Sequence, residues 1–410
     1  MAQFKLKALF FAILFWMLLL SSPLGELGLN TGFLDELIVL AMLPLVLAYR
    51  TIDRRLLVIW CLLMVFCVFS VASTYASPYF RGSMLTVLDL FLFCKPVVLL
   101  LLFLSLSDRV RITFLKYVSE SAFVFVMLAF FFYLLNLSFP VFEAFEVRLG
   151  LEAYSFILSN PGEFLNMLVI LGGAMFSASS SKRMMLGTVL TIFLALTTLR
   201  FKAFVVVVFG LMVAWFFSEA VRNRFEKKGI ELSFKKLFPV SRILFVLAIS
   251  ALPGWVQFEK YFLGDVMTPR LFLVINGVAV AGEYFPFGAG PGTYGSAVSK
   301  MYYSPLYVSL GFDQKYGLSS DETNFLSDNF WPMVFAQYGV SGALLVFGIY
   351  ALLVKYLLER IGVKGRQITV FVVFLFSLVM STLGAAILIG PIGCLYMMMI
   401  ASLPKRKGGV

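Results

Sequence analysis

The chain has 410 residues, of which 61% are hydrophobic and only 13% are charged. Soluble globular proteins average about 45–50% apolar and about 25% charged residues, so the composition excludes a water-soluble protein. The chain contains no histidine, which excludes a Ser-His-Asp triad, a Cys-His dyad, histidine-ligated zinc and an imidazole proton relay. The net charge of +11 does not indicate nucleic acid as a partner, because the cytoplasmic loops of membrane proteins collect Lys and Arg.

Apolar segments recur along the whole sequence and predict an all-α integral membrane protein, since a spanning helix needs about 20 mostly apolar residues. The first segment follows Lys5 and Lys7 and imitates a signal peptide, but the Ser-Ser-Pro run at 21–23 lacks a clear small-x-small cleavage pattern. We therefore interpret it as a retained helix. About twelve transmembrane helices are expected, at 8–22, 33–49, 56–73, 84–106, 117–138, 162–179, 184–199, 203–219, 243–258, 331–353, 368–384 and 386–403.

The distribution of positive charge orients these segments. With the N-terminus inside, most Lys and Arg residues fall in cytoplasmic segments, as the positive-inside rule requires, and both termini are cytoplasmic. Lys95 lies within a span. The external cations are therefore the informative ones, and they are Arg81, Arg148, Arg200, Lys202, Lys260, Arg270, Lys300 and Lys315.

One external loop, 259–330, is far longer than ordinary connections, and long structured loops usually carry function. The chain is accordingly divided into helices one to nine (1–258), a large loop with short interfacial helices (259–330) and helices ten to twelve (331–410). The glycine-rich run at 288–292 lacks the strand-then-helix setting of a phosphate loop. The basic cytoplasmic loop at 220–242 is typical of contact with anionic lipids.

Arg200 and Lys202 lie in a tight external turn between two apolar helices. Two interpretations stay open. The side chains can extend to the lipid headgroups, or they can form an anion site at the membrane surface, where a guanidinium grips phosphate with two hydrogen bonds.

Arg270 follows Thr268 and Pro269, a pattern that predicts a helix with Thr268 as N-cap and Pro269 as its first residue. Backbone N–H groups and Arg270 would converge on an anion at that helix end, although an ordinary cap region has the same pattern. The apolar stretch at 271–281 is too short to span a membrane.

The acids of the large loop cluster near its end. Asp328 immediately precedes the tenth span and is our first candidate for a general base, because partial desolvation at the membrane boundary raises the pKa of a carboxyl. Glu322 is the second candidate. Helix capping and solvated loop charge are the structural interpretations of these acids. Arg148, which precedes Gly150 by two residues, fits a structural turn as well as a binding residue.

Three further charged residues are weaker candidates. Asp35 and Glu36 begin the second span, where they complement a helix N-terminus. Lys95 lies near the middle of the fourth span, and charge within a membrane is often functional. Asp89 lies six positions away on another side of that helix and is not an obvious partner. No Asp-x-Asp motif occurs, so a metal-bound nucleotide-sugar site has no support, and neither a metal nor a cofactor is expected.

Four segments between 148 and 342 form an ordered set of motifs. They are Arg148 to Gly150 with Asn160 to Glu163, Thr198 to Ala203, Arg270 with Phe285 to Tyr294, and Asp328 to Phe330 with Gln337 to Gly342. In these segments and their order, the chain resembles the O-antigen polymerase and O-antigen ligase family of bacterial envelope polysaccharide enzymes.

The resemblance implies a metal-independent glycosyltransferase of GT-C-like fold in the bacterial inner membrane, with a periplasmic active site and one large periplasmic loop between helices nine and ten. Its donor would be a glycan on undecaprenyl pyrophosphate, and membrane lipids, a chain-length regulator protein and a flippase would be its partners. Arg200 and Arg270 would bind the donor pyrophosphate, with Lys202 and Arg148 beside them. Asp328 would be the catalytic base, with Glu322 as second choice.

The two branches of the family differ in the acceptor. A polymerase moves the glycan onto a lipid-linked repeat unit, and a ligase moves it onto lipid A-core. Ligases of this family tend to carry a histidine where Asp328 stands, so we prefer a polymerase, with a ligase as the rival function. Two functions outside the family also fit the sequence. One is a transporter of a lipid-linked or anionic substrate, which Lys95 favours, and the other is a lipid-linked sugar transferase that uses Asp35 and Glu36.

Overall fold

The structure of the chain is a computed structural model. It describes residues 2–29, 31–47, 53–79, 82–139, 141–142, 146–148, 150–158, 160–178, 181–218, 259, 267–362 and 365–405. The expected ninth span at 243–258, the basic loop at 220–242, Arg81 and Lys260 lie outside the described residues.

The expectation of an all-helical protein is confirmed, apart from one short two-stranded ribbon in which β1 (Val147–Arg148) pairs antiparallel with β2 (Leu151–Glu152). In chain order the described α-helices are α1 (Ala2–Leu19), α2 (Ser21–Glu26), α3 (Leu34–Leu47), α4 (Arg54–Ser73), α5 (Ser83–Ser105), α6 (Asp108–Asn136), α7 (Pro161–Ala178), α8 (Lys182–Thr197), α9 (Phe201–Phe216), α13 (Pro269–Glu283), α14 (Ala297–Met301), α15 (Pro305–Ser309), α16 (Phe330–Ile361), α17 (Arg366–Thr382) and α18 (Pro391–Ser402).

Five of the described helices, namely α4, α5, α6, α7 and α16, are long and apolar enough to cross a membrane by length and composition. The shorter apolar helices include α9, α17 and α18. Several boundaries differ from the expected spans. Helix α6 begins at Asp108, well before 117, and α16 continues past 353 to Ile361. The last helix begins only at Pro391, because a short 3-10 turn (Ile387–Ile389) precedes it and proline starts a helix readily.

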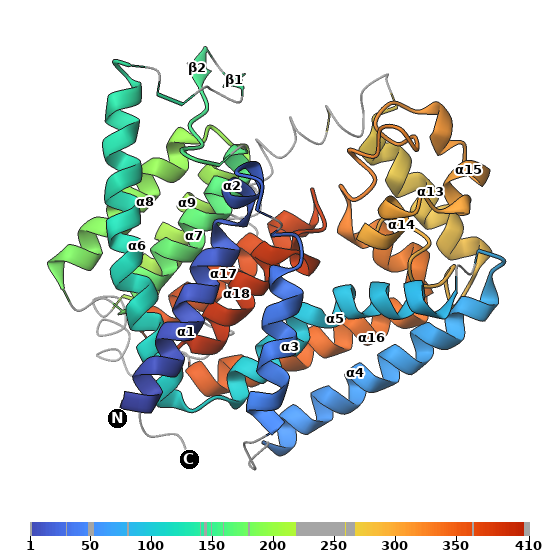
Figure 1. Cartoon of the computed structure of the whole chain (residues 1–410), viewed down its shortest axis with the longest axis horizontal. Helices are drawn as coiled ribbons and strands as arrows, with labels where there is room; N and C mark the ends of the chain where they lie inside the picture. Colours follow the sequence, from blue (N-terminus) through green and yellow to red (C-terminus); the bar gives the residue numbers. More distant parts are fainter. Residues whose placement is uncertain are drawn as a thin grey trace.

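Figure 1 shows the helices arranged in two parts. In the first, α7 packs against α6, α8 and α17, while α9 packs on α17 and α1 on α6. In the second, α13, α14 and α15 gather over the ends of α4 and α5. We call residues 267–329 the cap. The cap has its own hydrophobic core, which is separate from the core of the long helices and includes the fully buried Tyr294, Tyr307 and Phe312.

The cap is attached to the long helices at a break in α16. At Gly339 the backbone leaves the helical region, with φ 62° and ψ −170°. The break interrupts the helical hydrogen bonding, and cap backbone takes its place. The N–H of Ala289 donates to the carbonyl of Ala336 (2.8 Å), and the N–H of Gly290 donates to the carbonyl of Gln337 (2.9 Å). A buried backbone group must find such a partner, because an unpaired one is costly.

The two backbones approach so closely that only glycine fits. A Cβ atom added to Gly339 would lie 2.6 Å from the nitrogen of Gly288 and closer still to the carbonyl oxygen of Pro286. Gly288 also has a positive φ of 77°, the left-handed region that glycine adopts at little cost. The N–H of Ser341, just past the break, donates to the same Pro286 oxygen (3.2 Å).

Buried polar side chains complete this junction. On α5, the Asp89 carboxylate is 2% exposed and accepts the N–H of Gly292 (2.9 Å). On α16, the Gln337 amide donates to the carbonyl of Tyr294 (2.6 Å). The glycine-rich run at 288–292, which sequence patterns exclude as a phosphate loop, is therefore the segment that fastens the cap to α5 and α16.

We predict that Gly339→Ala destabilises the protein by more than the roughly 1–3 kcal/mol of a left-handed alanine, because its Cβ also meets cap backbone. The thermal unfolding midpoint in detergent would fall. Gly348→Ala is the matched control, since it lies in the same helix and its Cβ would meet nothing within 4 Å. We expect that control to be neutral or to gain roughly 0.5–1 kcal/mol. Equal midpoints for Gly339→Ala and the wild type would contradict this account of the junction.

Candidate functional site

The turn between α8 and α9 places two of the predicted cations. Arg200 is the N-cap residue of α9, and Lys202 follows in the first turn of that helix. Leu199, just before them, has a positive φ of 50°. A non-glycine residue in that region costs roughly 1–2 kcal/mol, and such strain clusters at functional sites. The turn thus holds both cations at the end of an apolar helix.

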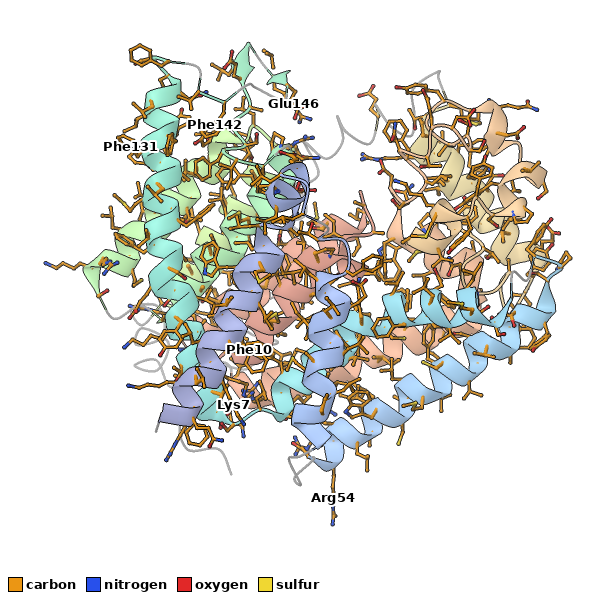
Figure 2. The ribbon with its side chains drawn as sticks, in the orientation of Figure 1. Lys7, Phe10, Arg54, Phe131, Phe142 and Glu146 are labelled. Atoms are coloured by element: carbon orange, nitrogen blue, oxygen red, sulfur yellow. The ribbon has the colours of Figure 1, made fainter. Side chains whose placement is uncertain are left out.

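Arg200 and Arg148 share one carboxylate. The guanidinium of Arg200 lies 2.9 Å from Glu146 Oε1 and donates to Asn160 Oδ1 (3.3 Å). The guanidinium of Arg148 lies 3.0 Å from Glu146 Oε2. Figure 2 shows Glu146 at the opposite end of the molecule from Lys7 and Arg54. The structure therefore brings Arg148 and Arg200 together through Glu146, which sequence reasoning missed.

Arg148 also belongs to a turn, as the structural interpretation expected, because the β1–β2 ribbon reverses the chain there. Asn160 has two roles. Its side chain accepts the N–H of Gly162 (2.7 Å) at the start of α7, and it accepts the Arg200 hydrogen bond. The Asn160-Pro161 pair thus starts a helix and orients a guanidinium, as the structural interpretation of this segment expects.

Lys202 is held by neutral groups. Its partly buried ammonium donates to Asn166 Oδ1 on α7 (2.7 Å) and to Ser381 Oγ on α17. In the part of the chain that the structure describes, no carboxylate lies within ion-pair distance of this ammonium. A buried charge without a counter-charge is costly. An anion bound next to Lys202 would supply that counter-charge.

Sequence reasoning also missed Asn166 and Ser381. The available signal was weak: each is a single polar residue within an apolar segment, a position that packing explains equally well. We call Arg148, Arg200 and Lys202, with their partners Glu146 and Asn166, the cation cluster.

Arg270 and Asp328 form an ion pair in the cap. As predicted, Thr268 is the N-cap of α13, and its hydroxyl accepts the N–H of Leu271 (3.3 Å). The guanidinium of Arg270 contacts Asp328 Oδ2 through Nε (3.3 Å) and Nη2 (3.2 Å). Both side chains are about a quarter exposed. The neighbouring Asn329 donates to the carbonyl of Arg270 (3.0 Å), which fixes the two segments together.

Asp328 does not cap the following helix. The N-cap residue of α16 is Asn329, and it makes no side-chain capping bond, so the capping interpretation of Asp328 is wrong. Burial raises the pKa of the Asp328 carboxyl above its usual range, while the charges of Arg270 and Lys300 oppose that rise. Glu322, the second candidate base, is exposed, and its N–H donates to Ser319 Oγ (3.2 Å). The structure does not bring Glu322 into the Arg270–Asp328 pair.

The end of α17 connects the two sets of residues. Ser381 accepts a hydrogen bond from Lys202, and Thr382 accepts one from the indole of Trp331 (3.2 Å). Trp331 follows Asp328 by three residues. Lys202 and Trp331 therefore contact adjacent residues at the end of α17.

A second group of charges lies deeper among the helices. The ammonium of Lys95 on α5 is 2.5 Å from Asp35 Oδ2 and 2.5 Å from Glu36 Oε1, at the start of α3. These side chains are 5%, 2% and 12% exposed. Asp35 and Glu36 therefore do not only complement the N-terminus of α3. They are also the ion-pair partners of Lys95 on α5.

Metal-binding patterns and relatives add no further assignment. Among the described residues, no group of three or more His, Cys, Asp or Glu side chains could hold a metal ion. The chain matches no family model, and no curated protein or solved structure matches it.

We predict that Lys95→Met lowers the free energy of unfolding by about 3–5 kcal/mol, because it leaves two buried carboxylates without their counter-charge. The thermal midpoint in detergent measures the change. A triple variant, Lys95→Met with Asp35→Leu and Glu36→Gln, should recover most of the loss, since replacing a whole buried ionic group by neutral side chains is often neutral. A single variant as stable as the wild type would show that the group does not stabilise the fold.

Proposed function

We propose that this protein is a polysaccharide polymerase that transfers an undecaprenyl-pyrophosphate-linked glycan onto a lipid-linked repeat unit. The observation that carries the proposal is the Lys202 ammonium, partly buried at the end of an apolar helix and bonded, among the described residues, only to neutral oxygens. Arg200 lies two residues before Lys202 in the sequence. Arg148 is joined to Arg200 through the shared carboxylate of Glu146. The pyrophosphate of a lipid-linked glycan is an anion at the membrane surface. A cation at the end of an apolar helix would lie at the same level.

The proposed reaction breaks the bond between C1 of the donor sugar and the pyrophosphate oxygen. Negative charge develops on the leaving pyrophosphate, and fixed cations stabilise such charge best when they are already in place. Arg200 can bind the phosphate with two hydrogen bonds, and Lys202 supplies a point charge. An acceptor hydroxyl forms the new bond to C1 and gives its proton to a base.

Asp328 is the proposed base, and its ion pair with Arg270 suggests how it becomes active. Arg270 neutralises the Asp328 carboxylate at 3.2 Å. A bound pyrophosphate would attract the Arg270 guanidinium and leave the carboxylate partly buried without its counter-charge. Desolvation and loss of that cation both raise the pKa of a carboxyl, so Asp328 would accept the hydroxyl proton more readily.

The proposed setting is a GT-C-like protein of about twelve spans in the bacterial inner membrane, with the cation cluster and the cap on the periplasmic side. The helical composition and the five long apolar helices support membrane insertion. Membrane lipids, a chain-length regulator protein and a flippase are the proposed partners. A ligase would differ only in its acceptor, lipid A-core.

A transporter is the second candidate function. The observation that favours it is the buried group of Lys95, Asp35 and Glu36, because ionisable residues within a membrane often mark ion or substrate pathways. A flux assay in sealed vesicles with a lipid-linked glycan separates the two functions. Lipid movement without glycan elongation would support the transporter.

For the polymerase, we expect Arg200→Ala and Lys202→Met each to lower the rate of glycan elongation by ~10²–10³-fold, the usual cost of removing one group that stabilises developing charge. The assay follows elongation of a purified lipid-linked repeat unit by protein in nanodiscs. Lys315→Met is the matched control, because Lys315 is an exposed cation of the cap. Full elongation by both site variants, at wild-type protein levels, would refute the pyrophosphate site. Transfer to added lipid A-core instead would identify a ligase.

The pH dependence follows from Asp328. Its base function needs the carboxylate, so the value of kcat/KM should fall as the pH drops through the raised pKa of this group. The acid limb should therefore lie above the pH at which an ordinary Asp titrates. Asp328→Asn should remove the limb and lower the rate by about 10²–10⁴-fold, whereas Asp313→Asn, an exposed cap residue, should leave both unchanged. An unchanged acid limb in Asp328→Asn would assign the base elsewhere.

A further inference from the structure

A second group of cations lies away from the candidate site, where α6 begins and where α16 and α18 end. Its members are Asp108 and Arg111 of α6, Arg360 of α16, and Lys405, which follows α18. Figure 1 shows that α6 begins toward the end of the molecule marked N and runs toward the β1–β2 ribbon. We call these four residues the basic cluster.

The basic cluster contains three cations and one carboxylate. Asp108 forms an ion pair with Arg111 and looser ones with Arg360 (3.8 Å) and Lys405 (3.7 Å). In the described part of the chain, no other carboxylate lies within ion-pair distance of these three cations. The cluster therefore has two positive charges more than its own acid can neutralise.

Neighbouring acids do not supply the missing negative charge. Glu359 is next to Arg360 in the sequence, but its carboxylate pairs with Arg55 of α4. Asp53 is the N-cap of α4, and its side chain accepts the N–H of Arg55 (3.0 Å). Both acids are thus engaged at the start of α4.

Backbone carbonyls at the end of α18 hold the two arginines close together. Nη1 of Arg111 and Nη1 of Arg360 donate to the same carbonyl, that of Ala401 (3.0 and 3.1 Å), and Nη2 of Arg360 donates to the carbonyl of Leu403 (3.3 Å). Both side chains are almost fully buried. A helix C-terminus carries only about half a negative charge, so capping of α18 does not balance two guanidinium groups that repel each other.

Three donors of this region remain unused. Among the described residues, Nε of Arg111, Nε of Arg360 and the hydroxyl of Ser107 are buried without a hydrogen-bond partner. Ser107 is the N-cap of α6 and makes no side-chain capping bond. An unpaired buried donor is costly. The N-terminus of the 29-residue α6 adds its positive dipole end at the same place, and an anion at this position would satisfy charge and donors together.

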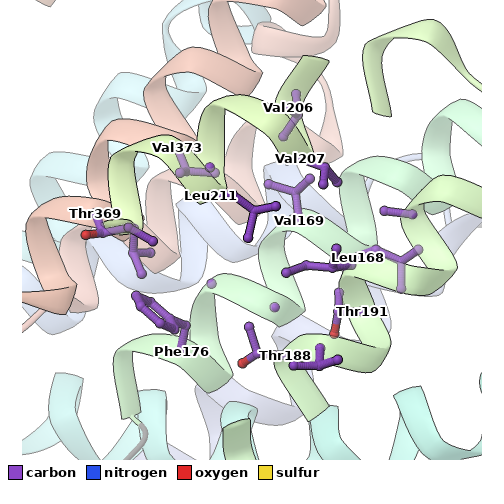
Figure 3. Close-up of a pocket in the computed structure, with 18 of the residues that line it drawn as sticks. Leu168, Val169, Phe176, Thr188, Thr191, Val206, Val207, Leu211, Thr369 and Val373 are labelled. Atoms are coloured by element: carbon purple, nitrogen blue, oxygen red, sulfur yellow. The ribbon is translucent and has the colours of Figure 1, made fainter. Parts of the chain in front are cut away.

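Other spaces between the helices do not offer these features. The apolar groove between α7, α8, α9 and α17 has a volume of about 260 Å³, and Figure 3 shows residues such as Val169, Phe176 and Leu211 around it. Among the described residues, no charged side chain lines that groove. The basic cluster, by contrast, combines excess positive charge with unpaired donors.

The basic cluster is accessible at the level of lipid headgroups. The side chains of Asp108 and Lys405 are about half exposed. The helices α6 and α16 are long and apolar enough to cross a membrane, so their ends lie near its surface. Basic pockets between such helices bind the headgroups of anionic lipids.

We infer that the basic cluster binds the phosphate group of an anionic phospholipid. Arg111 and Arg360 hold the phosphate oxygens from the buried side, and Lys405 adds a charge from the exposed side. With the topology predicted from the sequence, the lipid belongs to the cytoplasmic leaflet. The inference does not depend on the proposed polymerase, because none of the residues of the cation cluster takes part in this site.

Two site variants and one matched control test the inference. Lys405→Gln removes a half-exposed cation that makes only a loose ion pair with Asp108, so the variant should fold. Arg360→Gln removes a buried guanidinium, although it also removes bonds to the end of α18. Arg54→Gln is the control with the same change in charge, because Arg54 is exposed and Figure 2 shows it extending away from the helices.

The experiment follows the thermal unfolding midpoint of delipidated protein in detergent while phosphatidylglycerol is added. Phosphatidylcholine, which has a phosphate but no net charge, and inorganic phosphate are titrated in parallel. We expect phosphatidylglycerol to raise the midpoint, since a ligand of the folded state stabilises it. Its apparent Kd should rise about fivefold in Lys405→Gln and about 10–100-fold in Arg360→Gln. Arg54→Gln should match the wild type.

The other outcomes are equally specific. Equal weakening in Arg54→Gln and in the site variants would show that the lipid responds to surface charge alone, which overturns the site. An unchanged Kd in Lys405→Gln, or an equal gain in midpoint from phosphatidylcholine, would overturn it as well. A gain from inorganic phosphate but not from phosphatidylglycerol, lost in the site variants, would overturn the lipid as ligand and assign the site to a soluble phosphate.

Discussion

The close approach of cap backbone to the break in α16 is the constraint on which the rest of the structure depends. At Gly339 the helix gives up its own hydrogen bonds, and Ala289 and Gly290 replace them at 2.8 and 2.9 Å. Among apolar helices, an interrupted backbone is tolerated only when other groups satisfy it. These hydrogen bonds therefore attach the cap to α16. Helix α13, which carries Arg270, packs along α16, and Asp328 lies just before the first residue of α16.

Two lysines in this bundle owe their partners to helix packing and not to the local sequence. Lys95 meets Asp35 and Glu36 only because α5 packs on α3. In the same way, Lys202 meets Asn166 and Ser381 only because α7 and α17 pack near α9. The two results differ in character. The first group contains its own counter-charges, whereas the second places an ammonium among neutral oxygens, and that difference separates a structural charge from a candidate binding site.

The sequence predicted local features well and contacts poorly. The Thr268 cap followed from its pattern with Pro269, because capping depends on neighbouring residues only. Arg200 and Arg270 stood out because positive charge is rare on the predicted outer side. By contrast, no pattern pointed to Glu146, which joins Arg148 to Arg200, since any polar residue near a turn would look the same. Helix capping, one of the two structural alternatives for Asp328, is wrong because Asn329 occupies the N-cap position.

By itself, the sequence determined that the chain is a helical, membrane-type protein without histidine chemistry, and it identified the cations and acids on which a site could be built. Those conclusions follow from composition and from the length of apolar runs, which are properties of the chain alone. Only the tertiary structure decided which of these residues act together. It paired Arg270 with Asp328 and placed Lys202 between Asn166 and Ser381. The reason is physical: such contacts join residues far apart in sequence, and helix packing alone brings them together.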